Sequence, residues 1–194
     1  MTVAFVLGNG VSRRDVSIPY LKQRGRVYGC NALYREHAPD VLVATDRPIA
    51  TRIQESGYAL KHEFYTRKPL KDSGAQTVPP QYHGFSSGPI AVGLAALAQH
   101  RQIYLIGFDM GPVEGKFNNI YANTEFYKTS EHPPTFTGNW AKQLVKIMAD
   151  FPLARFYRII GPTTAEIAEF KQVKNLQNQD LMGFLDRINN QKDL

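Results

Sequence analysis

Short apolar runs of strand length are the feature that most constrains the fold of this chain. Residues 3–7, 27–30 and 41–44 form three such runs, each four or five residues long and rich in valine. Their apolar residues are contiguous instead of alternating with polar ones, which is typical of strands buried on both faces of a parallel sheet. Two later runs, 103–106 and 155–160, predict further strands of the same sheet.

The segments between these runs predict helices. Ser17 is a plausible N-cap for a short helix over 17–24, Gly57 is placed to end a helix over 48–56, and 89–100 is rich in alanine and leucine. The same reasoning predicts a strand over 60–65, an irregular connection over 66–85, and helices over 139–150, 163–171 and 173–188. Alternating strands and helices indicate a single-domain, Rossmann-like, doubly wound α/β fold over residues 1–194 with a mainly parallel sheet.

The composition limits the classes of protein to consider. Hydrophobic residues make up 43% and charged residues 21% of the chain, and no apolar run approaches the ~20 residues that span a bilayer. Cys30 is the single cysteine and no secretory signal is recognisable, so we expect a soluble, cytoplasmic protein. The net charge of +6 comes without a nucleic-acid-reading motif, so a nucleic-acid partner is not expected.

A glycine-rich loop follows the first predicted strand. Gly8, Asn9, Gly10 and Ser12 lie where glycines permit close backbone approach, and amide groups there could point at a phosphate. The match to the dinucleotide motif G-x-G-x-x-G is incomplete, because Arg13 stands at the third glycine position. We therefore expect a nucleotide-phosphate loop, but not a dinucleotide site.

Polar residues also follow the later strands, and parallel strands bring such residues to one edge of the sheet. Asn31 follows the second strand; it either contacts the nucleotide or caps the next segment. Asp46 and Asp109 are candidates for a ribose contact, a metal ligand or a base if their strands are neighbours, and Asp46 is alternatively a helix cap. Ser87 and Gly88 precede the alanine-rich helix, whose N-terminus favours an anion, with Ser87 as its expected N-cap.

Four segments together resemble the bacterial sialyltransferases that use CMP-sialic acid. That family has a G-N-G-P-S loop, a C-N pair after the second strand, an S-G pair before a helix, and a strand ending I-Y-L-x-G-x-D. This chain has the same order over roughly residues 3–150, with Val11 in place of the proline. A looser similarity extends to flagellin-modifying glycosyltransferase domains and an archaeal pterin diphosphokinase.

The resemblance implies a nucleotide sugar as ligand. It implies donor contacts from Asn9, Ser12, Asn31, Ser87 and Gly88, and a lid over the donor formed by residues 111–138. Lid tyrosines hold the donor phosphate in that family, and Tyr121 and Tyr127 are the candidates in this chain.

One departure concerns the catalytic base. The family's histidine precedes the helix after the lid, where this chain has Asn139, and asparagine cannot act as a base. His132 or Asp109 is then the candidate base. The shorter chain and this loss fit a reduced family member from a phage or an uncultured microbe.

Three functions remain open on this basis. The first is a metal-independent glycosyltransferase that uses a CMP-sugar and an unidentified acceptor, with no cofactor. The second is a Mg²⁺-dependent diphosphokinase or phosphotransferase with Asp46 and Asp109 as metal ligands. The third is nucleotide binding without turnover, with the apolar C-terminal helix packing on the body or on a second copy of the chain.

Overall fold

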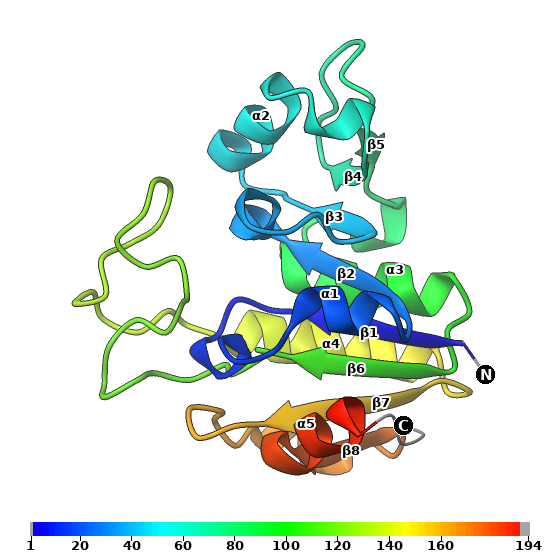
Figure 1. The fold of residues 1–194 in the computed structure, drawn as a ribbon, viewed down its shortest axis with the longest axis vertical. Coiled ribbons are helices and arrows are strands. Elements are labelled where there is room, and N and C mark those ends of the chain that lie inside the picture. The colour runs from blue at the N-terminus through cyan, green and yellow to red at the C-terminus, as the bar shows by residue number, and fades with distance from the viewer. Residues whose placement is uncertain (1, 191–194) are drawn as a thin grey trace.

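The computed structural model describes residues 2–190 and contains one eight-stranded sheet (Figure 1). The strands lie in the order β5-β4-β3-β2-β1-β6-β7-β8, and every neighbouring pair is parallel. The predicted α/β fold with a parallel sheet is confirmed. The strands are β1 (Val3–Leu7), β2 (Arg26–Cys30), β3 (Val41–Val43), β4 (Glu63–Thr66), β5 (Gln76–Thr77), β6 (Gln102–Ile106), β7 (Arg155–Ile160) and β8 (Leu176–Asp180).

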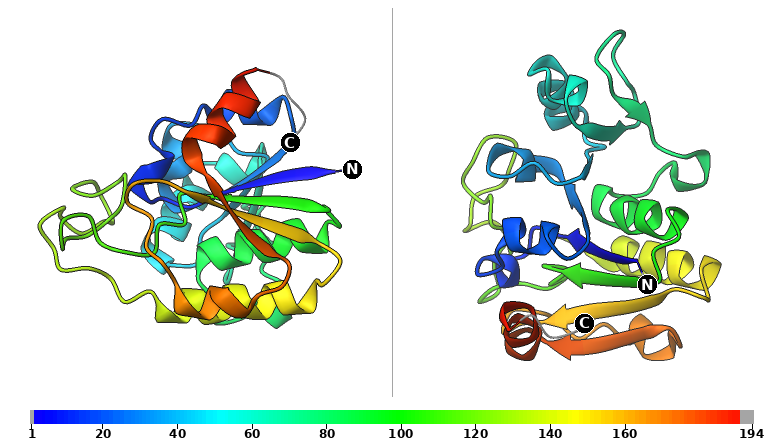
Figure 2. Two further views of the ribbon diagram at one scale, coloured as in Figure 1. Left: turned by 90° about the horizontal axis from the view of Figure 1, so that it is seen from below. Right: turned by 45° about the vertical axis from the view of Figure 1, so that its right-hand side comes forward.

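Helices cover both faces of the sheet. They are α1 (Ile18–Lys22), α2 (Arg47–Glu55), α3 (Ser87–Leu97), α4 (Gly138–Asp150) and α5 (Leu181–Asn189), with short 3-10 turns between them. Figure 2 shows α3 and α4 on one side of the sheet and α1 and α5 on the other. Side chains of β1 alternate between these layers, with Ala4 and Val6 in one buried cluster and Phe5 and Leu7 in the other. Both faces of the central strand are therefore buried, which explains its continuous apolar sequence.

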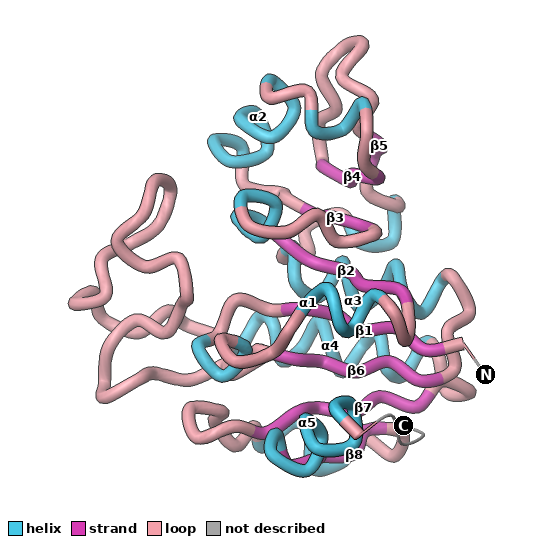
Figure 3. The backbone as a smooth tube through the Cα atoms, viewed as in Figure 1, coloured by secondary structure: helices cyan, strands magenta, loops and turns pink. Residues whose placement is uncertain are grey.

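The strand order reverses next to β1. The chain runs outward from β1 through β2, β3, β4 and β5, and then returns to place β6 on the other side of β1. Connections leaving β1 and β6 diverge at this point, and open parallel sheets bind ligands in the crevice beyond it. The long loop 111–138 lies on this side, beyond the carboxyl ends of the strands (Figure 3).

Two helix predictions near the C-terminus are wrong. The helix expected over 173–188 begins only at Leu181, and Leu176–Asp180 instead forms the edge strand β8. Pairing with β7 along the sheet edge overrides the helical spacing of the apolar residues. The apolar residues of α5, among them Phe184 and Ile188, are buried in the chain's own core.

The helix expected over 163–171 is also absent. This segment is a loop that ends in a 3-10 turn, Ala168–Gln172. Thr163 and Thr164 do not cap a helix; their hydroxyl groups donate to Asp109, on a different strand end. A long-range hydrogen bond thus replaces the local one that the sequence suggested.

The other element predictions need small changes. Gly57 ends α2 with a positive φ of 73°, as expected. The strand expected over 60–65 begins only at Glu63, and the supposedly irregular segment 66–85 contains the two-residue strand β5. No helix among residues 2–190 is long and apolar enough to cross a membrane.

Candidate functional site

Two glycines let the ends of β1 and β6 approach each other. A Cβ atom on Gly8 would lie 2.5 Å from the carbonyl oxygen of Gly107, and one on Gly107 would lie 2.8 Å from the carbonyl oxygen of Gly8. A side chain on Gly10 would likewise meet the Asp109 carboxylate at 2.5 Å. Gly10 itself has an ordinary φ of −65°. Close packing, and not a left-handed conformation, is therefore the reason for glycine at positions 8 and 10.

Asp109 is the centre of a buried hydrogen-bond network at this point. Its carboxylate accepts from the Ser12 amide at 3.0 Å and from the Ser12 hydroxyl. It also accepts from Asn118 Nδ2 at 3.2 Å, Thr163 Oγ1 at 2.8 Å and Thr164 Oγ1 at 3.2 Å. The residue is 2% exposed. Both carboxylate oxygens are used within the protein, which suits a group that holds loops together.

Four amide groups of the glycine-rich loop are already bonded within the protein. The N–H of Gly8 donates to Ile106, that of Gly10 to Gly107, and that of Val11 to the Asn118 side chain, at 2.8–2.9 Å. The Ser12 amide donates to Asp109. These four donors are not free for a phosphate, so the loop differs from the open amide nest expected from its glycines.

A cavity of about 460 Å³ lies at the carboxyl edge of the sheet, next to this loop. Most of the predicted site residues line it: Gly8, Asn9, Gly10, Asn31, Asp46, Ser87, Gly88, Asp109 and Tyr127. Ser12 and Tyr121 are buried behind the wall and do not line it. His132 also lies outside the lining, and its Nδ1 is 2.9 Å from the carbonyl oxygen of Pro133.

Two asparagines that line this cavity have side-chain oxygens without a hydrogen-bond partner. The Nδ2 of Asn9 donates to the Cys30 carbonyl at 3.3 Å, and its Oδ1 is buried without a partner in the described chain. The Oδ1 of Asn31 is likewise buried and unpaired there, and Asn31 has a positive φ of 54°. Buried acceptors without partners are uncommon in proteins and call for an explanation. A ligand that donates hydrogen bonds would satisfy both.

Cys30, between these asparagines, is an inert thiol. It is buried, and burial raises its pKa to about 12; Arg13 opposes this rise and Asp46 adds to it. The thiolate is the reactive form of cysteine, so this side chain is no nucleophile at neutral pH.

The N-terminus of α3 forms another part of the wall. Ser86, and not Ser87, is the N-cap of this helix, which begins at Ser87. The Ser87 hydroxyl instead accepts from the Thr45 amide at 3.0 Å and pairs with the Thr45 hydroxyl at 3.0 Å. This contact fixes the end of β3 beside the first turn of α3, where helix amides favour a negative group.

The two lid tyrosines are held in different ways. Tyr127 lines the cavity, and its hydroxyl accepts from the Ala32 amide at 3.2 Å. Tyr121 is buried, and its hydroxyl accepts from Arg13 at 3.2 Å. Burial raises the pKa of both phenols, that of Tyr121 to about 12, so both are protonated at neutral pH.

The lid also docks on the body through its tip. Arg52 of α2 forms an ion pair with Glu125 at 3.0 Å, and Arg35 donates to the Glu125 carbonyl at 3.0 Å. Both guanidinium groups lie within 6 Å of the Phe126 ring, which lines the cavity. Residues of the loop 111–138 are thereby held at the cavity by contacts with α2 and with the turn after β2.

Asp46 and Asp109 do not lie on neighbouring strands. β2 and β1 separate β3 from β6, so their carboxyl ends are three strand spacings, about 14 Å, apart. The strand order therefore does not make the two residues neighbours at the sheet edge, and the Asp109 carboxylate already accepts from five protein donors. Among residues 2–190 no group of three or more His, Cys, Asp or Glu side chains could hold a metal ion.

Several residues of this region were not predicted from the sequence. Arg158 is 2% exposed and donates to the carbonyl groups of Phe108 and Asp109 at 2.8–3.1 Å. Burial lowers its pKa to about 10. Asn118 bridges the lid to Val11 and Asp109, and Arg67, Lys128 and Trp140 line the cavity. Of these residues, only Arg158 could have been noticed in the sequence, because it is an arginine inside an apolar run of strand length.

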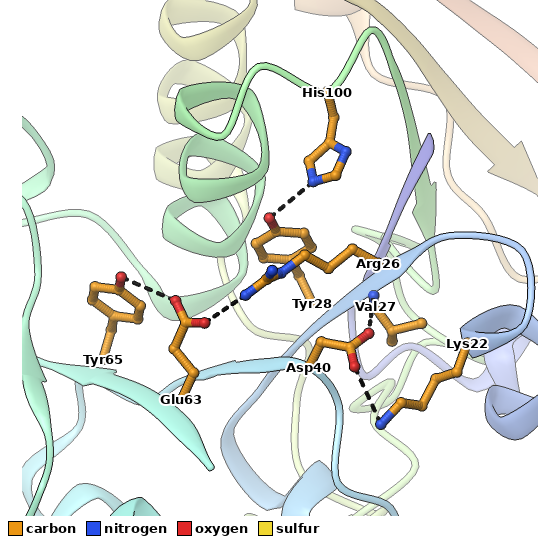
Figure 4. Close-up of polar contacts among 8 residues, drawn as sticks. All are labelled: Lys22, Arg26, Val27, Tyr28, Asp40, Glu63, Tyr65 and His100. Atoms are coloured by element: carbon orange, nitrogen blue, oxygen red, sulfur yellow. Dashed lines mark hydrogen bonds and ion pairs between the residues drawn. The ribbon is translucent and has the colours of Figure 1, made fainter. Parts of the chain in front are cut away.

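A second polar network lies at the amino ends of the strands, away from the cavity (Figure 4). Arg26 forms an ion pair with Glu63 at 2.5 Å, and the Tyr28 hydroxyl is 3.1 Å from His100 Nε2. His100 is 9% exposed, and burial, with a smaller effect of Arg26, lowers its pKa. Ligands of open parallel sheets bind at the opposite edge, so we assign this network to stability.

Comparison with solved structures identifies proteins of the same fold. The sialyltransferase CstII from Campylobacter jejuni, in complex with a substrate analogue, cytidine-5'-monophosphate, superposes with a TM-score of 0.53 at 14% identity, over 81% of this chain and 79% of that chain. CST-II with a trisaccharide acceptor and CMP gives 0.53 at 12% identity, over 81% and 80%. The chain therefore has a sialyltransferase-like fold. No protein-family model and no curated protein sequence matches it.

Proposed function

We propose that this chain binds a nucleotide sugar of the CMP-sugar class in the cavity at the carboxyl edge of its sheet and acts as a metal-independent, sialyltransferase-like glycosyltransferase. The observation that carries the proposal is a pair of asparagines, Asn9 and Asn31, which line the cavity beside the reversal of strand order and whose buried side-chain oxygens have no partner in the described chain. Support comes from the fold shared with sialyltransferases solved with CMP.

Different residues contact different parts of the ligand. Asn9 and Asn31 accept hydrogen bonds from it, and the first turn of α3 at Ser87 and Gly88 faces its phosphate. Tyr127 closes the cavity from the lid, which excludes water during transfer. Asp109 holds the loop that presents Asn9, and it has no free oxygen to act as the base.

Transfer would also need a base for the acceptor hydroxyl. His132 serves this role in our proposal only if the lid moves, since its ring lies outside the cavity lining. Binding and turnover are therefore tested separately. The Mg²⁺-dependent phosphotransferase is the less favoured alternative, because its two expected ligands are on strands that are not neighbours.

A thermal-shift panel tests binding. CMP, CDP, UDP, GDP and ATP are each added with and without Mg²⁺, since a ligand that binds only the native state raises the unfolding temperature. We expect the largest shift with CMP and no effect of Mg²⁺. A shift that requires Mg²⁺ would instead favour phosphotransfer, and no shift with any nucleotide would refute the proposal.

A pair of matched variants locates the site. Asn31→Asp keeps the shape of the side chain but places a negative charge in the cavity. Aspartate, like asparagine, tolerates the positive φ of this position. We expect it to weaken CMP binding at least tenfold. Asn178→Asp introduces the same charge on the exposed edge strand β8 and should leave binding unchanged. Equal effects of both variants would place the site elsewhere.

Release of CMP from CMP-sugars in the presence of acceptor glycans tests turnover. Release that is lost in His132→Ala supports transfer with that base. Binding of CMP without release from any CMP-sugar would identify the chain as a binding protein without turnover.

A further inference from the structure

Two aromatic side chains lie at the start of α4, where the loop 111–138 returns to the body of the protein. Trp140, in the first turn of the helix, lines the cavity. Phe136, just before the helix, is 75% exposed. Its ring folds back over the helix start, since a Cβ atom on Gly138 would collide with the tip of that ring. Aromatic surface is therefore present both in the cavity wall and on the solvent side of the same helix start.

The core does not account for this surface. Trp140 packs against the buried cluster between the sheet, α3 and α4, yet it is only partly buried. Phe136 remains exposed over three quarters of its area. Exposed apolar area beside a cavity is typical of a site that binds a ligand with an apolar face. Trp140 and Phe136 together are called the aromatic surface below.

A hydrogen bond places the aromatic surface next to α3. Gln143, one turn after Trp140, accepts from the Ser86 amide at 2.9 Å. Ser86 is the N-cap of α3, and α3 and α4 lie side by side on one face of the sheet (Figure 2). The aromatic surface therefore adjoins the first turn of α3, where the proposed function places the donor phosphate.

This position is where a glycosyl acceptor has to lie. In the transfer, the acceptor oxygen forms a bond to the sugar carbon while the bond from that carbon to the donor phosphate breaks. CMP leaves, and the proton of the acceptor hydroxyl passes to a base. The acceptor must therefore enter from solvent and reach the phosphate, and the aromatic surface extends between these two places.

Polar groups beside the aromatic surface can bind hydroxyl groups. Thr135 and Thr137 precede and follow Phe136 in the sequence, and both line the cavity. The Thr137 hydroxyl donates to the Met110 carbonyl at 3.2 Å. The Thr135 hydroxyl and the indole N–H of Trp140 form no hydrogen bond within residues 2–190, so both are available to a ligand. A ligand with one apolar face and several hydroxyl groups fits this combination.

We propose that Trp140 and Phe136 form the acceptor subsite, and that the acceptor is a glycoside whose pyranose ring stacks on Trp140. The inference rests on the proposed function and names the acceptor class that it leaves open. A pyranose ring with equatorial hydroxyl groups has a face of C–H groups, which packs on an aromatic ring while the hydroxyls point outward. Aromatic side chains supply a large apolar area for this contact.

The fluorescence of Trp140 tests the subsite directly, because this residue is the single tryptophan of the chain. The native protein, saturated with CMP, is titrated with methyl β-galactoside, methyl β-glucoside and sorbitol, which has hydroxyl groups but no ring. With at least one glycoside we expect a saturable change in emission and about a twofold decrease in quenching by acrylamide. Sorbitol should give neither.

Matched variants test the outer part of the aromatic surface. Phe136→Ser should weaken binding of the glycoside at least threefold, because an aromatic contact contributes about 0.5–1.5 kcal/mol, which corresponds to roughly twofold to twelvefold in affinity. Leu153→Ser is the control. Leu153 is 76% exposed, lies beyond the C-terminal end of α4 and does not line the cavity, so its replacement should leave glycoside binding unchanged.

The outcomes separate the two proposals. The acceptor subsite is overturned if neither glycoside gives a saturable change, if sorbitol gives the same change, or if the two variants have equal effects. CMP binding is measured by calorimetry before each titration, and the proposed function stands in these cases as long as CMP binds. Failure of CMP to bind the native protein would overturn the proposed function and this inference together.

Discussion

Replacement of Asp109 by asparagine tests whether this carboxylate is the structural centre of the site. The substitution keeps the shape of the side chain but removes its charge and one of its acceptor oxygens. The Oδ2 position faces the Ser12 amide and Asn118 Nδ2, which can only donate, so the new oxygen must take that position. The new amino group then faces the hydroxyls of Ser12 and Thr164, which can rotate to accept.

The expected cost follows from the strength of these hydrogen bonds. A hydrogen bond to a charged group contributes about 1.5–3 kcal/mol and a neutral one about 0.5–1.5 kcal/mol. The substitution weakens five hydrogen bonds and removes the attraction between Asp109 and the buried Arg158. Because such contributions are not additive, we expect the free energy of unfolding to decrease by about 3–4 kcal/mol, which is less than their sum. For a chain of this size that lowers the melting temperature by roughly 6–16 °C.

Urea denaturation measures this change, with Asp46→Asn as the matched control. The Asp46 side chain has no hydrogen bond or ion pair in the described residues, and asparagine is an equally good N-cap. Its variant should therefore stay within about 0.5 kcal/mol of the native protein. The reasoning is refuted if Asp109→Asn lowers the free energy of unfolding by less than about 1 kcal/mol while the dependence of that free energy on urea concentration is unchanged. It is also refuted if the two variants lower it equally.

Two further predictions concern other parts of the molecule. The lowered pKa of His100 means that below pH 6.5 the unfolded chain binds a proton that the native protein does not, so stability should be complete above pH 6.5 and fall as the pH falls. His100→Gln should remove this part of the pH dependence in urea titrations between pH 5 and 7.5; an unchanged profile would contradict the assignment. Arg52→Gln breaks an ion pair with Glu125 whose side chains are 51% and 55% exposed, so it should lower the free energy of unfolding by less than about 1 kcal/mol. Because this ion pair holds the loop that contains Lys128, tryptic cleavage at Lys128 should increase severalfold. Lys146→Gln, which breaks a surface ion pair within α4, is the control, and equal cleavage in both variants would show that Arg52 does not hold the lid.

Local patterns predicted most of the sheet. The apolar runs at β1, β6 and β7 were recognised because a strand buried on both faces shows its burial in its own sequence. The strand β8 was missed, since its sequence Leu-Gln-Asn-Gln-Asp has no apolar run and exists as a strand only through its pairing with β7. The helix predicted over 163–171 failed for a similar reason, because its threonine hydroxyls bond to a distant carboxylate.

The candidate site was predicted by position but not by role. Asn9, Asn31, Asp46 and Ser87 were expected at one edge because parallel strands end together, and all four line the cavity. The sequence could not show that four amides of the glycine loop would donate to Ile106, Gly107, Asn118 and Asp109. It also could not show that His132 would lie outside the cavity lining.

By itself, the sequence determined the strands buried on both faces, the glycine loop after β1 and the polar residues that follow the strands. The tertiary structure alone decided which of those groups are free. Asp109 is bonded to Ser12, 97 positions away, and to Thr163, 54 positions away, whereas Asn9 and Asn31 keep unpaired oxygens at the cavity. Periodicity and capping act over a few residues, but the partner of a buried polar group is set by whichever segments the sheet order brings together.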